Sequence, residues 1–333
     1  MELNGLKEIL KKELSFRYKQ VEKAIFQDFI SNWSEATNLP KKLRDELNEK
    51  CSLEIVAEVF VSKKNTKKTL ITLSDGLKIE SVLMQHKDGR NTVCVSCQVG
   101  CPMACDFCAT GSLGFKRNLS SDEMLLQVIF FERLLQKQQN KERVTNVVFM
   151  GMGEPMLNLE NILKAIDSLN DKNKFNIGAR KISISTVGIV DGIKKIAKYD
   201  KQINLAISLH AANDKIRTSF IKTGKGNNIE KILKAVDYYI EKTGRKVMFE
   251  YLMIDGVNDS EKSANELAVL LKKPLYMINL IPYNVTFDKF KPSSKEKIEK
   301  FKNILIKYGI ETTQRESYGG DIGGACGQLA GKK

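Results

Sequence analysis

The second half of the chain alternates between apolar runs typical of β-strands and amphipathic segments typical of helices. The strand-like runs are TNVVFM, KISIST, INLAISLH, KVMFEYLMI, LYMINLIPYN and GIETTQR. In the segment IEKILKAVDYYI, residues Ile229, Ile232, Leu233, Val236 and Ile240 fall on one helical face. Such alternation predicts a parallel sheet covered by helices. About six units follow one another, fewer than the eight of a closed barrel. We therefore expect an α/β fold, a partial (β/α)6 TIM-like barrel with its chemistry at the carboxyl ends of the strands.

Two regions with other periodicities precede this barrel. Residues 1–50 place apolar side chains at helical spacing, and Pro40 opens the last of these helices. The next region alternates with period two and contains the turns SDG and KDGRN, a pattern that predicts a β meander. We expect a helical accessory domain at 1–50, a β extension at 51–92, and the barrel with a C-terminal cysteine segment at 93–333.

Charge and composition indicate which partners and which cellular compartment to expect. The net charge of +14 favours a polyanionic partner, although a Lys-rich, AT-biased genome would give the same excess. No apolar run approaches the ~20 residues of a membrane span, and the start of the chain lacks the apolar core of a signal peptide. We therefore expect a cytoplasmic protein without a membrane partner. In a reducing compartment, clustered cysteines favour metal binding or catalysis over structural disulfides.

Five of the seven cysteines lie in the stretch CVSCQVGCPMACDFCATG. Within it, Cys101, Cys105 and Cys108 form a C-x3-C-x2-C pattern on a loop after a strand. Structural zinc usually takes four ligands from two separated pairs, and no second CxxC pair follows. Three thiolates without a fourth favour a 4Fe-4S cluster with one iron open to another ligand. An unusual three-cysteine zinc site and chance clustering are the alternatives.

This pattern resembles the signature of the radical S-adenosylmethionine enzymes. A wider set of motifs, spread over residues 78–331, resembles the RlmN/Cfr family of RNA adenosine methyltransferases. The motifs are CVSCQVGCPMACDFCATGSLGFKRNL, VVFMGMGEPMLN, ISISTVGI, AISLHA, NLIPYN and DIGGACGQLAG. The N-terminal helices resemble the accessory, RNA-binding domain of that family in pattern alone. The resemblance implies a radical-SAM barrel, a 4Fe-4S cluster on Cys101, Cys105 and Cys108, and two S-adenosylmethionine molecules per turnover, one as methyl donor and one as radical source.

Other matched residues end the predicted strands, where polar groups can assemble a pocket. The resemblance assigns the following residues to S-adenosylmethionine binding: Gly153, Glu154, Ser185, Ser208, Leu209, His210 and Asn284. A glycine lets a ligand approach the backbone, and a carboxylate can accept hydrogen bonds from an ammonium group. Taken alone, Gly153 and Glu154 would be read as an ordinary β-turn, and His210 as a structural histidine.

The resemblance also implies three catalytic residues. Cys326, in the Gly-rich segment ACGQLAG, would carry the methyl group as S-methylcysteine. Cys94 would resolve the later protein–RNA adduct by attacking the Cys326 sulfur, leaving a disulfide. Glu80 would accept the proton of the adenine ring, although it could instead be a solvent-facing residue of an alternating strand. Cys97 stands where the family usually has Ser or Thr. We expect it to be a small buried residue, with a competing resolving thiol as the alternative. We expect Cys51 to be structural.

The implied reaction methylates carbon 2 of an adenosine in the peptidyl transferase centre of 23S rRNA, and of an anticodon-loop adenosine in tRNA. Methylation at carbon 8, as in the antibiotic-resistance branch, is the alternative, and GMGEPM and CGQLAG favour carbon 2. A non-catalytic iron–sulfur or zinc protein that binds RNA would not need Cys326, Cys94 or Glu80. We further expect an electron donor such as flavodoxin or ferredoxin, a monomer, and phosphate contacts from the segment GFKRNL. The segment SFIKTGKGNNIEKIL departs from the family pattern, which puts RNA choice in doubt.

Overall fold

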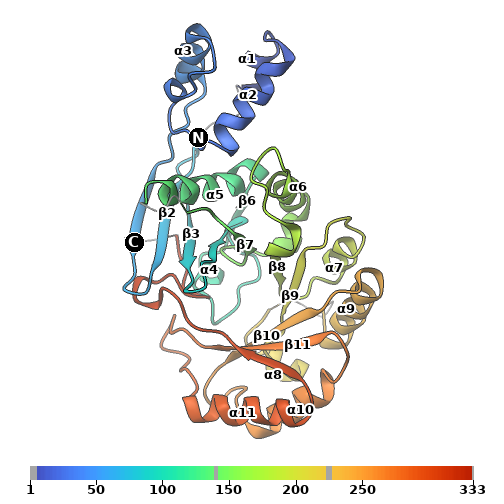
Figure 1. The fold of residues 1–333 in the computed structure, drawn as a ribbon. Coiled ribbons are helices and arrows are strands. Elements are labelled where there is room, and N and C mark those ends of the chain that lie inside the picture. The colour runs from blue at the N-terminus through green and yellow to red at the C-terminus, as the bar shows by residue number, and fades with distance from the viewer. Residues whose placement is uncertain (1–5, 139–141, 223–226, 332–333) are drawn as a thin grey trace.

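A ten-stranded sheet organises the chain (Figure 1), here a computed structural model that describes residues 6–138, 142–222 and 227–331. The strand order is β1-β2-β3-β4-β7-β8-β9-β10-β11-β12. Strands β1 to β4 pair antiparallel, whereas every pair from β4 onward is parallel. The sheet strands are β1 Ala57–Val61, β2 Thr66–Thr72, β3 Lys78–Gln85, β4 Asn91–Cys94, β7 Asn146–Phe149, β8 Ile182–Thr186, β9 Asn204–Ser208, β10 Val247–Met253, β11 Tyr276–Pro282 and β12 Glu311–Gln314. A separate hairpin pairs β5 Gln98–Gly100 with β6 Phe115–Asn118.

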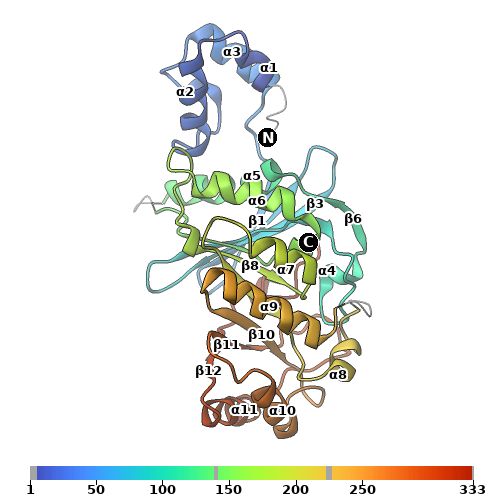
Figure 2. The ribbon, with the colours of Figure 1, turned by 90° about the vertical axis from the view of Figure 1, so that its right-hand side faces the viewer.

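Helices cover the outer side of the parallel strands (Figures 1 and 2). The barrel helices are α4 Ala109–Ser112, α5 Ser121–Gln136, α6 Leu159–Asn170, α7 Val190–Ile196, α8 Asp214–Thr218, α9 Ile229–Thr243, α10 Glu261–Leu270 and α11 Lys295–Lys307. In α9, Ile229, Ile232 and Val236 of the predicted apolar face are buried, and Leu233 and Ile240 are partly buried. The Asn228 side chain caps the first turn, and Gly244 ends the helix at φ 63°. These features fix where α9 begins and ends against the sheet.

The predicted partial barrel is confirmed. Each of β4, β7, β8, β9, β10 and β11 is followed by a helix on the outer side, and β12 adds a further parallel strand at the open edge. The expected boundary between residues 92 and 93 lies inside β4, the strand at which antiparallel pairing changes to parallel. Residues 223–226 of the atypical segment SFIKTGKGNNIEKIL lie outside the described residues.

The N-terminal helices form a unit that packs on the barrel next to α5 (Figures 1 and 2). Its helices are α1 Leu6–Leu10, α2 Ser15–Phe26 and α3 Lys41–Lys50. The fully buried Trp33 donates its indole N–H to the carbonyl oxygen of Cys51 at 2.7 Å, so Cys51 has the structural position expected for it. From α5, Arg133 donates to the carbonyl oxygens of Phe29 and Leu53 at 3.2 and 2.8 Å, which ties the unit to the barrel.

Candidate active site

The cluster loop, residues 101–108, leaves the short strand β5 rather than the barrel strand β4 itself. Its fold depends on two glycines. Gly100 has φ +76°, and a Cβ there would lie 1.8 Å from the carbonyl oxygen of Gly114. A Cβ on Gly111 would come within 2.9 Å of the backbone of Cys105. The backbone therefore closes tightly around the loop, which fixes its three cysteines.

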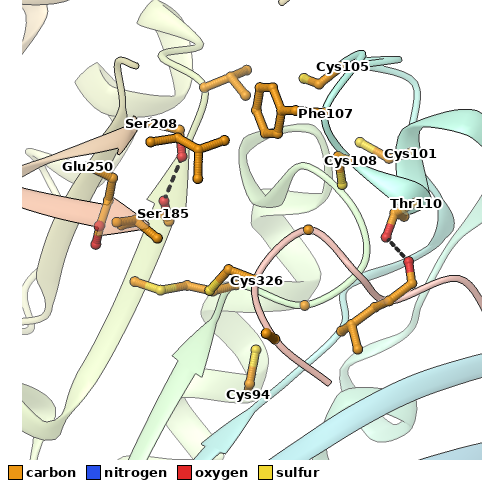
Figure 3. A pocket seen from close by; sticks show the side chains of 18 of the residues that line it. Cys94, Cys101, Cys105, Phe107, Cys108, Thr110, Ser185, Ser208, Glu250 and Cys326 are labelled. Atoms are coloured by element: carbon orange, nitrogen blue, oxygen red, sulfur yellow. Dashed lines mark hydrogen bonds between the residues drawn. The ribbon is translucent and has the colours of Figure 1, made fainter. Parts of the chain in front are cut away.

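A single pocket brings the predicted thiols together (Figure 3). Including its mouth, it encloses about 1290 Å³. Its cysteines are Cys94, Cys101, Cys105, Cys108 and Cys326. They come from β4, the cluster loop and the C-terminal segment, which we define as residues 316–331. The sequence predicted that Cys326 acts together with cysteines more than 200 positions away, and the fold places all five around one space.

Burial controls the ionisation of these thiols. It raises the pKa of Cys94 and of Cys101 to about 12, and raises the pKa of Cys105 and Cys108 as well. Such thiols become thiolates when a positively charged metal centre offsets the loss of solvation. Among the described residues, no group of three His, Cys, Asp or Glu side chains is arranged to hold one metal ion. Three thiols on one tight loop fit a cluster with separate irons better than a single zinc ion.

Cys326 lies between Cys94 and the cluster loop (Figure 3). All seven cysteines are free thiols, so Cys94 and Cys326 are not bonded to each other here. The carbonyl oxygen of Cys326 accepts a hydrogen bond from the Asn284 side chain at 3.2 Å. Asn284 therefore holds the backbone of the cysteine rather than lining the pocket.

Gly153 and Glu154 lie in the loop after β7, at the pocket wall. Gly153 has φ +106°, and a Cβ there would clash with the Gln98 side chain at 2.6 Å. The Glu154 carboxylate accepts backbone N–H groups of Met156 at 3.0 Å and Val187 at 2.9 Å. Burial raises the pKa of this carboxyl. Glu154 thus joins the end of β7 to the end of β8 while facing the pocket.

Two serines and a histidine end the next strands. The hydroxyls of Ser185 and Ser208 lie 3.2 Å apart at the pocket wall (Figure 3). His210 lines the same wall, and its Nδ1 accepts the backbone N–H of Leu252 at 3.1 Å. Burial lowers the pKa of His210 to about 3, so the ring is neutral and serves as an acceptor. Leu209 is fully buried and is not among the residues that line the pocket.

Glu80 does not line the pocket, and it is not solvent-facing either, because its side chain is completely buried. Its Oε2 accepts the backbone N–H groups of Ala330 at 2.5 Å and Gly331 at 3.0 Å. The Lys68 ammonium lies 2.8 Å from Oε1, close enough for an ion pair but without hydrogen-bond geometry. In this arrangement Glu80 fastens the C-terminal segment to the β extension.

The structure adds two pocket residues that the sequence analysis did not single out, Arg315 and Glu250. Electrostatic interaction with Cys326, and to a smaller extent with Glu250 and Cys94, raises the pKa of Arg315. Burial raises the pKa of Glu250, whose carboxylate accepts the Asn279 side chain at 2.8 Å. Glu250 could have been found from the sequence, because a carboxylate inside the apolar run KVMFEYLMI indicates a buried functional group. Arg315 directly follows β12, but no strand pattern tells which way such a side chain points.

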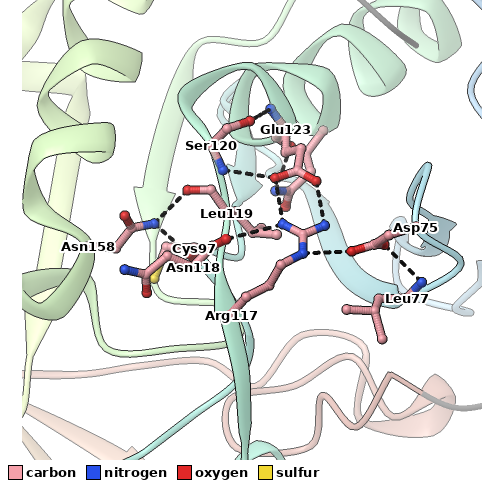
Figure 4. A network of polar contacts seen from close by, with 10 residues as sticks. Asp75, Leu77, Cys97, Arg117, Asn118, Leu119, Ser120, Glu123 and Asn158 are labelled. Atoms are coloured by element: carbon pink, nitrogen blue, oxygen red, sulfur yellow. Dashed lines mark hydrogen bonds and ion pairs between the residues drawn. The ribbon is translucent and has the colours of Figure 1, made fainter.

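Two residues of the segment GFKRNL bind other parts of the protein (Figure 4). Arg117 binds Asp75 at 2.7 Å and forms two hydrogen bonds with Glu123 at 2.9 and 2.7 Å. Asn118 accepts the Gln98 side chain at 2.8 Å. Of the three polar residues predicted to contact phosphate, these two already have protein partners. The nearby Cys97 is buried, does not line the pocket, and reads as the small packing residue that the sequence favoured.

Comparison with known proteins first assigns the chain to a class of enzymes. Residues 95–268 match the model of the Radical SAM superfamily, which spans more than half of the chain. The fold is also that of the "radical SAM methyltransferase from Sphaerobacter thermophilus", with a TM-score of 0.94, 40% identity, and coverage of 100% of this chain and 98% of that one. The protein is therefore a radical S-adenosylmethionine enzyme, a class that implies a 4Fe-4S cluster and S-adenosylmethionine as cofactors.

Curated relatives narrow the assignment to one family. The chain is 47% identical to the "Probable dual-specificity RNA methyltransferase RlmN" of Caldicellulosiruptor saccharolyticus, over 95% of this chain and 91% of that protein. It is 43% identical to the "Ribosomal RNA large subunit methyltransferase N" of Nitrosopumilus maritimus, over 94% of this chain and 92% of that protein. The chain belongs to the RlmN family and is an RNA methyltransferase. Within its described residues, no helix has the length and apolar character needed to cross a bilayer.

Proposed function

We propose that the protein methylates carbon 2 of an adenosine in the peptidyl transferase centre of 23S rRNA and of an anticodon-loop adenosine in tRNA. The observation that supports this reaction is the shared pocket of the cluster loop, Cys94 and Cys326. A ring carbon of adenine lacks nucleophilic character, so an ordinary methyl transfer would fail there. A pocket that combines a radical source with two further thiols suits such a carbon.

The cofactor site would be built from residues of several strand ends. Cys101, Cys105 and Cys108 would hold the 4Fe-4S cluster, and when bound the cluster and two S-adenosylmethionine molecules per turnover supply a methyl group and a carbon-centred radical. Pocket residues for S-adenosylmethionine are Gly153, Glu154, Ser185, Ser208 and His210. Leu209 would support this wall from behind, and Asn284 would act by holding the Cys326 backbone.

Cys326 would carry the methyl group as a thioether. After a hydrogen atom leaves that methyl, its carbon bonds to the adenine ring and tethers RNA to Cys326. The adduct would then lose one electron, for which the cluster would be the acceptor when bound, and Glu80 would accept the ring proton. The Cys94 thiolate attacks the Cys326 sulfur, the bond from that sulfur to the former methyl carbon breaks, and the released carbon takes up a proton. The products are a methylated adenosine and a Cys94–Cys326 disulfide.

This scheme requires the C-terminal segment to move. Both backbone N–H groups on Glu80 belong to that segment, and its buried side chain is not among the residues that line the pocket. Release of residues 330 and 331 would free the carboxylate and Cys326 in the same step. The methyl-carrying thiol and the proton acceptor would thus become available together.

Nucleoside mass spectrometry tests the proposal. Anaerobically reconstituted protein, reduced by flavodoxin, is incubated with S-adenosylmethionine and either a 23S rRNA fragment or a tRNA. We expect 2-methyladenosine together with 5′-deoxyadenosine from the wild-type protein, and no methyladenosine from the Cys326→Ala variant. The product 8-methyladenosine would establish the alternative position, and absence of any methyladenosine would contradict the proposed function.

A further inference from the structure

A second hollow opens from the pocket along the inner face of the sheet. It shares Met84, Met150, Glu250, Arg315 and Tyr318 with the pocket, so the two spaces meet at these side chains. With its open mouth it encloses about 2800 Å³. We call it the groove. It runs outward between the turn after β1, the turn after β3, and the residues that follow β12.

The walls of the groove carry polar side chains among apolar ones such as Val148 and Met248. Interior positions of parallel barrels are normally filled by branched apolar side chains. Here Asn146 on β7, Ser183 on β8 and Asn279 on β11 face the hollow, and the first two are only half-buried. The inner face therefore offers hydrogen-bonding groups to an occupant between its apolar side chains.

Basic residues dominate the rim. Lys63 and Lys64 lie in the turn after β1, and Lys87 and Arg90 in the turn after β3, all exposed. None of the three lysines forms an ion pair with a carboxylate of the described chain. Arg90 pairs with Asp88 at 2.8 Å, but both side chains are more than half exposed, and such pairs are weak. The rim can therefore take up phosphates.

Two aromatic rings stand on the same wall. His86 and Tyr318 meet edge to face, with ring centroids 5.0 Å apart. The His86 ring bonds Thr92 at 3.1 Å, and burial lowers its pKa, so it remains a neutral, fixed ring. Tyr318 borders both the pocket and the groove. Aromatic faces beside a basic track are the elements with which proteins bind single-stranded nucleic acid.

We propose that the groove binds the single-stranded RNA flanking the target adenosine. The rim residues contact its phosphates, and His86 and Tyr318 stack on an unpaired base while the target base passes Met150 and Arg315 into the pocket. This inference rests on the proposed function and names where its substrate enters. The polar groups on the wall, the exposed basic rim and the ring pair together favour RNA as the occupant.

Equilibrium binding to an anticodon stem-loop RNA tests the rim. The variant replaces Lys63, Lys64, Lys87 and Arg90 with Gln, and its matched control replaces four exposed lysines of the outer helices with Gln. The control residues are Lys194, Lys195, Lys231 and Lys295. The slope of log K against log salt should fall by about 0.7 for each phosphate that the rim variant no longer neutralises, and should stay unchanged in the control. Thermal melting checks that both variants fold.

Tyr318 supplies a second, charge-independent test. Tyr318→Leu should weaken binding of the same RNA by roughly 5- to 100-fold, whereas Tyr318→Phe, which keeps the ring, should bind like the wild type. Unchanged binding and salt slope in the rim variant, with wild-type protein still producing methyladenosine, would overturn the groove assignment and leave the function intact. Failure of the wild-type protein to methylate RNA would instead overturn the proposed function.

Discussion

The cluster loop and the C-terminal segment both bring cysteines to the pocket, but they are held in different ways. The cluster loop is fixed by backbone closure around Gly100 and Gly111 and by packing of Cys105 against Phe220 and Ile254. The C-terminal segment is held by a backbone hydrogen bond from Ala109 to Gly327 at 2.7 Å, by the buried Leu329, and by single side chains of other elements that bond its backbone or its polar groups. These side chains are Ser62, Glu80, Thr110 and Asn284.

The difference matches the role that we propose for each segment. Tight backbone packing leaves no alternative position, as a permanent cofactor site needs. Separate hydrogen bonds of about 1 kcal/mol each can be exchanged for others, as a segment that carries a methyl group to a substrate needs. A fixed and a releasable cysteine segment should therefore respond differently to substitution.

The largest effect is expected in the cluster loop. Cys101→Ala removes a thiol that no neighbouring residue can replace, so bound iron and 5′-deoxyadenosine formation should both be abolished. Cys97→Ser is the matched control, because Cys97 lies four residues away but outside the pocket, and it should keep its iron and most of its activity. Iron content and 5′-deoxyadenosine release measure the outcome. Full activity in Cys101→Ala would contradict the ligand assignment.

The next effect separates the two thiols outside the cluster loop. Cys94→Ala should still load Cys326 and react with RNA, but it lacks the thiol that frees the product. Covalent protein–RNA adduct should therefore accumulate, seen as a shifted band on a denaturing gel. The double variant Cys94→Ala/Cys326→Ala should show no such band. Normal turnover by Cys94→Ala would show that another group resolves the adduct.

A smaller effect is expected where the C-terminal segment meets the β extension. Lys68→Met leaves the buried Glu80 carboxylate without its cation, which costs about 3–5 kcal/mol when a buried pair is broken. The free energy of unfolding should fall by this amount, and proteolysis of the C-terminal segment should speed up. Lys234→Met, which removes an exposed pair with Glu230, should cost no more than about 0.5 kcal/mol. Equal losses in the two variants would refute the buried anchor.

The same contrast explains how much could be predicted from sequence. The barrel followed from periodicity, because each strand and helix is specified by its own apolar pattern, as in α9 and β8. The cluster cysteines and Cys326 were found because their motifs are local. What could not be predicted depends on tertiary approach. The bonding of Glu80 to residues 330 and 331, and the approach of Arg315 to Cys326, join segments whose meeting no local pattern encodes.

The smallest effect is expected where the two segments touch each other. Thr110, in α4 directly after the cluster loop, donates its hydroxyl to the carbonyl oxygen of Leu329 at 2.6 Å. Thr110→Val keeps the shape and removes this bond, which should shift the balance toward the released segment by about 1 kcal/mol, or about fivefold. Ser112→Ala, on the same helix, removes a bond to Ala109 only and should leave that balance unchanged. Hydrogen exchange of the C-terminal amides measures it, while iron content should stay at the wild-type level in both variants. Because the Thr110 side chain links the releasable segment to the fixed loop, loss of iron in Thr110→Val would mean that the two form a single rigid unit and that the contrast is wrong.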